Sequence, residues 1–449
     1  MEGGSLRVIV IGAGLSGLST ALALSKKGCN VTVFERAKEL KEVGAGVQVS
    51  VNMLRILDSW GLAHHISTDG VILRKIVVRR WEDDRVLGEQ MIMPWMQDRY
   101  NYPSYVIHRA DLFRILFKAC EEQGVRFKTN ARVDRVDFEA TRVEMEDGST
   151  HEADLIVGAD GIRSIVRQQM QEIHREEHQL RKTGDSVYRA IIDIESVPSE
   201  QLRGLMREPI GTRWLGESRH IMAYPIRAGR LYNLVFIHPT KDTPDDAGSD
   251  VPLWTTKGSL SDLREEFRGW SSTVSQLIDC IPRDVLTVWN LCDSAPLSRW
   301  IHGSVALVGD SCHPTLPYVA QGAAQAIEDA AVLGECIDLY RGDPIRNILK
   351  VFQVARKNRA ERMTVRSARC REGDVSTQAS AQATRTALHH ADGPEQEERD
   401  KQMRAAMEGQ KTSHSDHWMD MKKQDEMYGF DVVKDVRERR DELKASVEE

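Results

Sequence analysis

One stretch near the N-terminus carries the strongest structural signal in the chain: Val8-Ile9-Val10-Ile11-Gly12-Ala13-Gly14-Leu15-Ser16-Gly17. Its apolar run predicts a buried strand, and its glycines follow the spacing G-x-G-x-x-G at the start of a predicted helix. Gly12 permits a tight bend, Gly14 lets the backbone approach a pyrophosphate, and Gly17 lets the helix pack closely on the strand. Free N–H groups at the start of that helix favour a bound anion.

The residues that follow complete a β-α-β pattern. We predict a strand over 6–11, a helix over 16–27 and a second strand over 30–34. Glu35 closes the second strand, where a carboxylate can accept hydrogen bonds from a ribose hydroxyl. This agreement favours a dinucleotide-binding unit, and the alternative is a tight strand-to-helix turn that binds no ligand.

A second segment far downstream again reads as an apolar strand that ends in glycine: residues 305–314, Val-Ala-Leu-Val-Gly-Asp-Ser-Cys-His-Pro. Its Asp310 can bind the hydroxyls of a sugar alcohol such as ribitol. The small residues Gly322 and Ala323 then open a helix, where a flat ring can lie against the backbone and N–H groups can stabilise a reduced flavin. Two such sites far apart fit FAD better than NAD. The alternative for Asp310 is an ordinary helix-capping aspartate.

The composition excludes several classes of protein. The chain has 449 residues and a net charge of −7, whereas nucleic-acid binding needs a basic surface. Its seven cysteines are scattered and form no C-x-x-C pair, so we expect reduced thiols and no metal site. The uncharged run over 8–25 contains glycines that a strand–turn–helix explains and a membrane span does not. We therefore expect a soluble cytoplasmic protein with no nucleic-acid or membrane partner.

Four segments are expected along the chain. Residues 1–185 form an FAD-binding domain with interspersed sheet at 71–107, and residues 186–300 form a substrate-binding domain of β-sheet. Residues 301–370 return to the FAD-binding domain as its flavin end and a helix, and residues 371–449 form a helical, partly mobile C-terminal segment. The predicted fold class is α/β: a Rossmann-like FAD-binding domain with an inserted, mainly antiparallel β-sheet domain and a helical C-terminus.

Three motifs together resemble those of a known family. They are the glycine motif with Glu35, the Asp-Gly motif of residues 154–164 (Asp-Leu-Ile-Val-Gly-Ala-Asp-Gly-Ile-Arg-Ser), and Gly309-Asp310. The chain resembles the group A flavoprotein aromatic hydroxylases, and within them the fungal salicylate-hydroxylase-like FAD-dependent monooxygenases. Shorter matches extend the resemblance over most of the chain: residues 44–48, 108–112 and 388–396. The resemblance implies a fold like that of para-hydroxybenzoate hydroxylase.

The resemblance also implies roles for residues of the cofactor site. Arg109 would contact the phosphates of FAD, Gly46 would lie beside the flavin, and Asp160 with Arg163 would serve both FAD and NADPH. The alternatives are a surface arginine, a plain turn glycine and a structural Asp–Arg pair. No second G-x-G-x-x-G exists, so NADPH or NADH is expected to dock transiently in a groove.

Two residues of the predicted sheet domain match catalytic positions of the family. Arg189 would hold an anionic group of the substrate, and Tyr224 would orient or deprotonate its phenol. The alternatives are a surface ion pair and a core tyrosine with a satisfied hydroxyl. We expect His313 to shape its loop and Cys312 to pack. Core packing is also expected for four apolar residues: Met91, Met93, Trp95 and Met96.

By this resemblance the reaction is a hydroxylation. Flavin reduced by NAD(P)H would react with O2 to a C4a-hydroperoxide, which hydroxylates a phenolic aromatic acid or a related secondary metabolite. Decarboxylative hydroxylation, as in salicylate hydroxylases, is the leading variant. The alternatives are hydroxylation or epoxidation of an indole or isoprenoid metabolite, and a flavin-binding protein with little turnover. The substrate, the choice between NADH and NADPH, and a monomeric or homodimeric state stay open.

Overall fold

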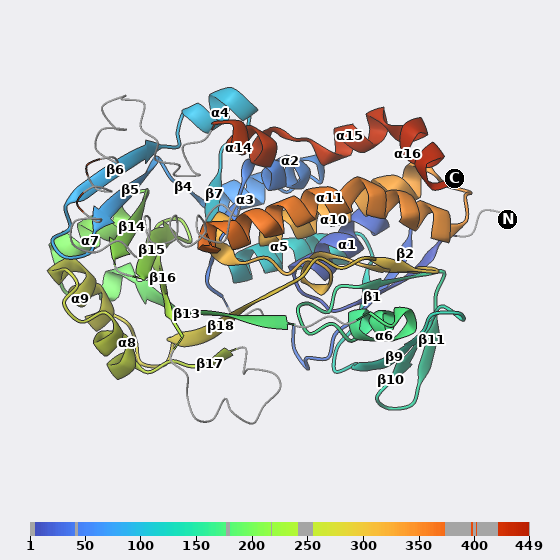
Figure 1. Cartoon of the computed structure of the whole chain (residues 1–449), viewed down its shortest axis with the longest axis horizontal. Coiled ribbons are helices and arrows are strands. Elements are labelled where there is room, and N and C mark those ends of the chain that lie inside the picture. Colours follow the sequence, from blue (N-terminus) through green and yellow to red (C-terminus); the bar gives the residue numbers. More distant parts are fainter. Residues whose placement is uncertain are drawn as a thin grey trace.

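A computed structural model describes residues 5–40, 44–176, 180–216, 218–240, 255–372 and 421–448, together with Glu397 and Lys401. These residues form two lobes, one around a mainly parallel sheet and one around a larger, mainly antiparallel sheet (Figure 1). The segment 388–396, which contributes to the family resemblance, lies outside the described residues.

The first lobe is built on a six-stranded sheet with the strand order β19-β20-β12-β1-β2-β8. Its strands are β1 (Arg7–Ile11), β2 (Asn30–Phe34), β8 (Arg126–Lys128), β12 (Leu155–Gly158), β19 (Ile301–His302) and β20 (Val305–Leu307). Neighbouring strands are parallel except β19 and β20. Parallel strands end at one edge of the sheet, so Gly12 after β1 and Gly309 after β20 come together there. The two predicted motifs are therefore joined through β12, which pairs with both strands.

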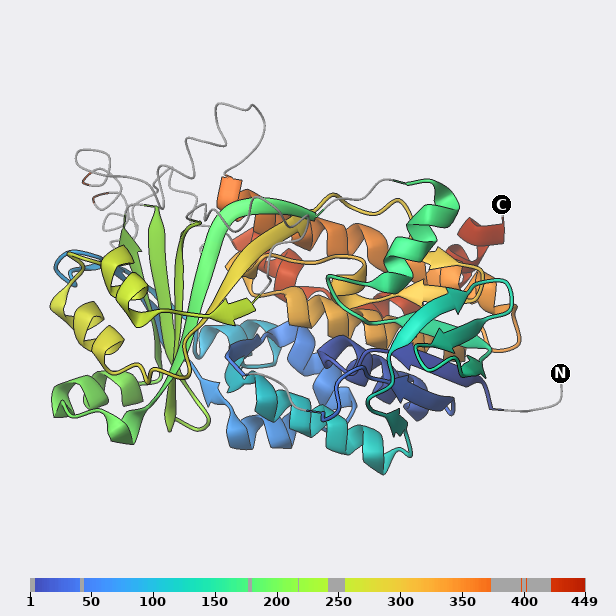
Figure 2. The ribbon, with the colours of Figure 1, turned by 90° about the horizontal axis from the view of Figure 1, so that it is seen from below.

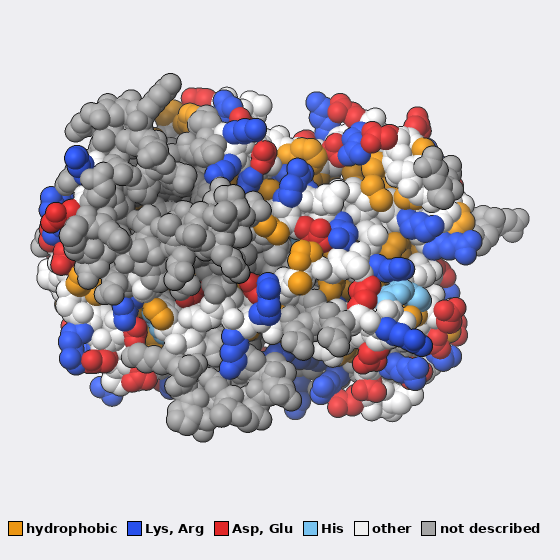
Figure 3. Space-filling view, in the orientation of Figure 1, with side chains coloured by type: hydrophobic (Ala, Val, Ile, Leu, Met, Phe, Trp, Pro, Cys, Tyr) orange, Lys and Arg blue, Asp and Glu red, His pale blue; other side chains and the backbone are white. Residues whose placement is uncertain are grey.

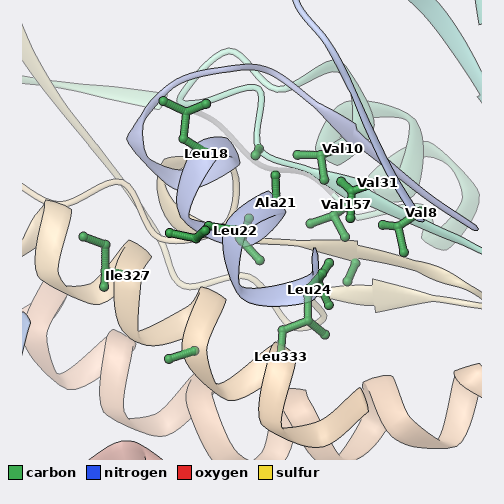
Figure 4. Packing of buried hydrophobic residues seen from close by; sticks show 14 of the residues in the cluster. Val8, Val10, Leu18, Ala21, Leu22, Leu24, Val31, Val157, Ile327 and Leu333 are labelled. Carbon is green, nitrogen blue, oxygen red and sulfur yellow. The ribbon is translucent and has the colours of Figure 1, made fainter. Parts of the chain in front are cut away.

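Helix α1 (Leu15–Lys26) lies between this sheet and helix α10 (Gly322–Leu339), as Figure 4 shows. Side chains on several sides of α1 are buried, and Leu18 and Leu22 have no exposed surface. A helix that is covered by a sheet on one side and by a helix on the other must be apolar nearly all round. Its packing holds the start of α1, and with it the glycine turn, against the end of β1.

The second lobe is an eight-stranded sheet with the order β17-β18-β13-β16-β15-β14-β5-β6. Its strands are β5 (Lys75–Arg80), β6 (Val86–Met91), β13 (Leu180–Asp193), β14 (Ile210–Gly216), β15 (Arg219–Ile226), β16 (Leu231–Pro239), β17 (Thr255–Lys257) and β18 (Thr287–Ser294). Only β14 and β5 are parallel neighbours. Strands β5 and β6 extend this sheet, although the sequence places residues 71–107 with the first lobe. A strand pattern does not reveal its partner, because strand pairing is non-local.

Helices cover one face of the eight-stranded sheet. Helices α7 (Glu200–Arg207), α8 (Leu260–Glu266) and α9 (Ser272–Asp279) lie on the outer face (Figure 2). They help to bury an apolar cluster that includes Trp214 and Phe236. The opposite face turns toward the first lobe, and because side chains alternate along a strand, a second set of residues lines it.

Smaller elements complete the two lobes. They are β3 (Gly46–Val49), β4 (Val71–Ile72), β7 (Tyr105–His108), β9 (Val133–Asp137), β10 (Arg142–Met145), β11 (Thr150–Glu152), α2 (Val51–Ser59), α3 (Ala63–Asp69), α4 (Trp95–Tyr100), α5 (Arg109–Glu122) and α6 (Ile165–His174). The sheet β3-β7-β4 touches the larger sheet, since the backbone N–H of Gly46 donates to Oδ1 of Asn233 over 2.7 Å.

The described C-terminal part packs back on the first lobe. Beyond α11 (Ile345–Glu372) it comprises α14 (Met421–Gln424), a π-helical turn (Asp425–Gly429), α15 (Val432–Glu438) and α16 (Arg440–Glu448). Met427 and Tyr428 of the π-helical turn join an apolar cluster that also contains Tyr224. The C-terminal part thus packs against the region where the two lobes meet.

One packing prediction is wrong. Met91 is 56% exposed, because it ends β6 at the edge of the large sheet, where no further strand covers it. Met96 is buried, and Met93 and Trp95 are half-buried beside it in the cluster that contains Tyr224.

The surface is polar and mixed in charge. On the face drawn in Figure 3, basic and acidic side chains of the described residues are interspersed. Within the described residues, no helix has both the length and the apolar character that crossing a bilayer requires.

Candidate active site

A cavity of about 1210 Å³ lies between the two lobes. The first lobe contributes the edge where β1 and β20 end, and the second lobe contributes the inner face of its sheet. The predicted site residues in its wall are Gly14, Gly46, Arg109, Arg189, Tyr224, Asp310, Gly322 and Ala323. Four other predicted residues do not line the cavity and lie behind its wall: Gly12, Gly17, Glu35 and Asp160.

The glycine turn is required by close backbone packing. Gly12 has φ of +99°, and a Cβ there would lie 2.6 Å from the carbonyl oxygen of Ala159 on the neighbouring strand end. A Cβ on Gly17 would overlap the carbonyl oxygen of Gly12. A Cβ on Gly14, by contrast, would meet no atom within 4 Å, and Gly14 lines the cavity. The open space at Gly14 is therefore available to a ligand, which fits a pyrophosphate at the start of α1.

Glu35 braces the glycine turn. Its Oε2 accepts from the backbone N–H of Ala13 over 2.8 Å, and its Oε1 accepts from the N–H of Ala37 over 2.9 Å. Each carboxylate oxygen keeps further acceptor capacity, so a ribose hydroxyl can still bind. The ribose contact stays a prediction, and the contact with Ala13 explains why the turn needs an acceptor at this position.

Asp160 carries an unsatisfied buried oxygen. Its Oδ2 accepts from the N–H of Ile165 over 2.8 Å at the start of α6, whereas its Oδ1 has no hydrogen-bond partner among the described residues. Burial raises the pKa of Asp160, against the hydrogen bonds that favour the carboxylate. Its neighbour Gly161 lines the cavity, so a cofactor hydroxyl is a suitable donor to Oδ1. Arg163 is exposed at the surface.

Asp310 presents its carboxylate to the cavity. It follows β20, and its side chain is exposed to the cavity although it lies deep in the molecule. Burial raises the pKa of Asp310, while the nearby His313, Arg109 and Arg167 oppose that rise. Arg109 starts α5 and lines the same cavity, so the structure brings these two predicted residues into one electrostatic environment.

The start of α10 faces the same space. Gly322 and Ala323 both line the cavity, and Gln321 before them makes no side-chain cap to the helix. The first N–H groups of a helix have no intrahelical acceptor, so they are available to a negatively charged group. The open space at Gly14, the free oxygen of Asp160 and the position of Asp310 all fit FAD laid along this edge.

Asp329, which the sequence reasoning missed, supports the loop that carries Asp310. Its Oδ2 accepts from the backbone N–H of Gly309 over 2.9 Å and lies 2.5 Å from Nε2 of His313. Its Oδ1 accepts from Nε of Arg356 over 2.8 Å. His313 is thus buried behind the loop and does not line the cavity.

Glu328 extends this network between α10 and α11. Its carboxylate accepts from Arg359, from Arg356 and, over 2.7 Å, from Nδ2 of Asn52. Burial would raise the pKa of Glu328, but the two guanidinium groups outweigh it and lower the pKa. The signal for this network was present in the sequence as the adjacent acidic residues Glu328 and Asp329 between two stretches of small and apolar residues, which burial permits only when cations pair with them.

Cys312, His313 and Asp329 lie close enough together to be considered as metal ligands. Both oxygens of Asp329 already accept hydrogen bonds, and Arg356 adds a positive charge beside them. Burial raises the pKa of the Cys312 thiol well above its usual value, which keeps the thiol neutral. These contacts describe a hydrogen-bonded support for the loop, and thiolate ligation of a metal does not fit them.

Arg189 projects from the middle of the inner sheet face. It lies in one row with Val235, Met222 and Arg213 on the three neighbouring strands. Its guanidinium lies over the ring of Trp289, and its Nε has no hydrogen-bond partner among the described residues. Burial lowers the pKa of Arg189, with Tyr224 opposing and Arg109 adding to the effect.

Tyr224 is buried at the junction of both lobes. Burial raises its pKa to about 12, against the influence of Arg189. Gly46 lies directly against it: a Cβ on Gly46 would lie 2.6 Å from the hydroxyl of Tyr224 and 2.9 Å from Cγ of Asn233. Gly46 thus packs against Tyr224 and also lines the cavity, where its place beside the flavin stays a prediction. Glycine at 46 is needed for Tyr224 to reach the cavity wall.

Four further residues of the cavity wall were not found from the sequence: Arg213, His220, Trp289 and Tyr318. His220 is two residues before Met222 and four before Tyr224, so strand alternation from Tyr224 could have identified it. Burial lowers the pKa of His220 well below its usual value, with Arg213 adding to the effect, so its imidazole is neutral at neutral pH. Tyr318 donates to Oδ2 of Asp185 over 2.7 Å and thereby joins the loop before α10 to β13.

Comparison with known proteins agrees with this geometry. Residues 5–367 match the model of the FAD-binding domain family. The FAD-dependent monooxygenase OpS4 of Beauveria bassiana (strain ARSEF 2860) is 32% identical over 440 residues, covering 95% of this chain and 96% of that protein. The 3-hydroxybenzoate 6-hydroxylase 1 of Aquipseudomonas alcaligenes is 35% identical over 362 residues, covering 79% and 86%. A salicylate hydroxylase substrate complex has the same fold, with a TM-score of 0.72, 22% identity and 98% coverage of both chains.

The edge of the first lobe that fits a dinucleotide and the inner face of the larger sheet enclose one cavity. This arrangement defines a two-lobed flavoprotein. The chain belongs to the FAD-binding domain family that the match over residues 5–367 identifies. It is an FAD-dependent monooxygenase of the aromatic-hydroxylase class, as the sequence resemblance predicts.

Proposed function

We propose that this protein hydroxylates a phenolic aromatic acid at the expense of O2 and NAD(P)H, with loss of the carboxyl group as the leading variant. One observation carries the proposal: Arg189 is half-buried in the cavity wall and meets no carboxylate among the described residues. A partly desolvated cation without a counter-charge is unfavourable, so an anion brought in by the substrate is favoured at this point.

The relatives support a substrate that carries both an acid and a phenol. By its name, the Aquipseudomonas relative acts on 3-hydroxybenzoate, which has both groups. A guanidinium binds a carboxylate through two parallel hydrogen bonds, which fixes the orientation of the ring as well as its charge. Arg189 would hold the carboxylate in this way, with the Trp289 ring keeping the guanidinium in place.

FAD, when bound, supplies the activation of O2 and the transfer of one oxygen atom to the ring. The residues that would hold it are Gly12, Gly14, Gly17, Glu35, Gly46, Arg109, Asp160, Asp310, Gly322 and Ala323. NADPH or NADH would dock at the surface, where Asp160 and the exposed Arg163 remain the proposed contacts.

Tyr224 would orient the phenol as a hydrogen-bond donor. With a pKa of about 12, the buried hydroxyl stays protonated at neutral pH. A protonated donor beside the phenol oxygen would stabilise the ionised phenol, the form whose ring is electron-rich enough for attack by an electrophilic oxygen. Of the two roles predicted for Tyr224, orientation therefore fits better than deprotonation. Apolar neighbours such as Met222 and Val235 disfavour water around the ring, which limits unproductive loss of activated oxygen.

The test uses the purified holoenzyme. Its flavin spectrum is recorded first, and oxidation of NADH and of NADPH is then measured with salicylate and with 3-hydroxybenzoate. Mass spectrometry of the product separates simple hydroxylation from hydroxylation with loss of carbon dioxide. We expect hydroxylated product in amounts that match the NAD(P)H consumed.

Three results would overturn parts of this proposal. A flavin-bound protein that hydroxylates indole or isoprenoid compounds but no phenolic acid would favour the alternative substrates. A flavin-bound protein that oxidises no NAD(P)H with any of these compounds would favour a binding protein with little turnover. Product that retains the carboxyl group would exclude the decarboxylative variant.

A further inference from the structure

The cavity extends across most of the large sheet. Seven of its eight strands, from β18 to β6, contribute residues to the wall. Six strand spacings of about 4.8 Å give this wall a width of about 29 Å along the sheet. A single benzoic acid covers only a small fraction of that width.

The wall is polar near Arg189 and largely apolar beyond it. From β13 toward β6 the row through Arg189 continues with Val235, Met222, Arg213 and Val78. The same region of the cavity is also lined by other apolar side chains: Leu73, Ile76, Ile92 and Leu231. An apolar ligand surface is therefore favoured over β15 and β5, with Arg213 on β14 and Glu89 and Gln90 on β6 as the polar groups at this end.

This end of the cavity lies beyond the residues assigned to FAD, of which Gly46 comes nearest by packing on Tyr224 of β15. Those residues lie at the edge of the first lobe and on β3 and α10, and none of them lies on β14, β5 or β6. Ile76 lies on β5, four strand spacings from Arg189, which is about 19 Å along the sheet. Neither FAD nor a single-ring acid held by Arg189 accounts for this space.

We propose that the natural substrate is an aromatic acid with a long apolar extension, either an alkyl chain or further rings, which lies over β15, β14 and β5. This inference rests on the proposed function, because it assumes that the carboxylate of the substrate pairs with Arg189. The extension then contacts Met222 and Ile76 in turn. The site thus selects its substrate by an anchored head and an apolar tail.

The experiment uses a series of salicylic acids with ethyl, butyl and hexyl chains on the ring. Binding to the oxidised holoenzyme is measured by the change in the flavin spectrum, which does not require turnover. Each added methylene should increase affinity about fourfold, which is the equivalent of about 0.8 kcal/mol for its burial. An affinity that does not change with chain length, or that falls, would overturn the inference.

A matched pair of variants tests where the extension lies. Ile76→Trp fills the far end of the cavity, and Ile76→Val keeps it open. The affinity for the hexyl compound, divided by the affinity for the ethyl compound, should fall at least tenfold in Ile76→Trp. The same ratio should change little in Ile76→Val. Met222→Trp gives a second block if Ile76→Trp does not fold, and an unchanged ratio in both blocking variants would contradict the placement.

Failure of this inference is distinguishable from failure of the proposed function. If unsubstituted salicylate is hydroxylated efficiently and longer chains bind no better, the extension is wrong and the proposed function stands. If Arg189→Gln leaves the affinity of every acid unchanged, the anchoring of the carboxylate is wrong, and the proposed function fails with it.

Discussion

The guanidinium carbon of Arg189 lies 5.4 Å from the centre of the Trp289 ring. The two residues come from neighbouring strands, since Arg189 pairs with Thr287 and Val187 pairs with Trp289. An indole face attracts a cation without neutralising it, so the guanidinium keeps its charge and its N–H donors for a ligand. This pair therefore fixes the position of one positive charge in the cavity wall.

Arg189→Gln should weaken the binding of aromatic acids about tenfold to a hundredfold, as expected for a lost hydrogen bond to a charged group. Kd is measured from the flavin spectrum, together with the ratio of product to NAD(P)H consumed. The methyl ester of salicylate, which has no charge, serves as the control ligand and should be much less affected. Equal losses for acid and ester would contradict an ion pair at Arg189.

Tyr224→Phe should lower kcat while FAD content and the affinity for the acid change little, because only the hydroxyl proposed to face the phenol is lost. Since the pKa of Tyr224 is about 12, it is protonated throughout the neutral range. The ratio of wild-type to variant kcat should therefore stay constant between pH 6 and pH 9, roughly the range in which Tyr224 does not titrate. A ratio that rises steeply within that range would instead support Tyr224 as a base.

Gly14→Ala and Gly17→Ala should have different effects although they lie three residues apart. A Cβ on Gly14 meets only open cavity, so the apoprotein should keep its Tm while its affinity for FAD falls. A Cβ on Gly17 overlaps the Gly12 carbonyl, so that variant should lose stability as well. Thermal unfolding of the apoprotein and titration with FAD separate the two. Normal FAD binding by Gly14→Ala would contradict a pyrophosphate at this turn.

Asp329→Asn should destabilise the protein by about 3–5 kcal/mol, because it removes one partner of a buried ion pair and leaves Arg356 short of a counter-charge. Urea unfolding measures the loss. Asp343→Asn, whose carboxylate pairs with Lys444 near the surface, is the control and should cost less than about 1 kcal/mol. Similar losses in both variants would contradict a special role for the buried network.

The same network should make the protein sensitive to acid. Burial opposes ionisation of Glu328 and Asp329, but guanidinium groups lower the pKa of both below the ordinary values of 4.5 and 3.8, and His313 also lowers the pKa of Asp329. Their contribution to stability is thus complete above about pH 4.5 and is lost as the pH falls through the lowered pKa values. Tm measured from pH 7 downward should fall less steeply in the double variant Glu328→Gln, Asp329→Asn. Glu139→Gln at the surface should keep the wild-type slope.

Much of the first lobe could be predicted from local sequence patterns. The run into Gly12 predicted β1, the helix from Gly17 onward and the second strand before Glu35, and the structure places them within one or two residues of the expected bounds. Such predictions succeed because the β-α-β unit is short and its glycines are required by contacts within it. The antiparallel character of the second sheet was also predictable from alternation along its strands.

The surroundings of individual site residues were not predictable in this way. The contact of Gly46 with Tyr224, which is distant in sequence, was not predicted. The residues 75–91 were assigned to the first lobe, yet they extend the sheet of the second. The partners of Asp329 were missed, because Gly309 and Arg356 come near it only when α10 and α11 pack together.

The amino-acid sequence by itself determined the class of protein and the cofactor, and it predicted the two ends at which that cofactor would be held, because each end is a short motif whose chemistry is local. Only the tertiary structure decided that Arg189 lacks a carboxylate partner among the described residues, that Tyr224 is buried enough to stay protonated, and that the cavity runs on past both of them. Burial, charge pairing and cavity shape arise from contacts between strands far apart in the chain, so no stretch of sequence specifies them alone.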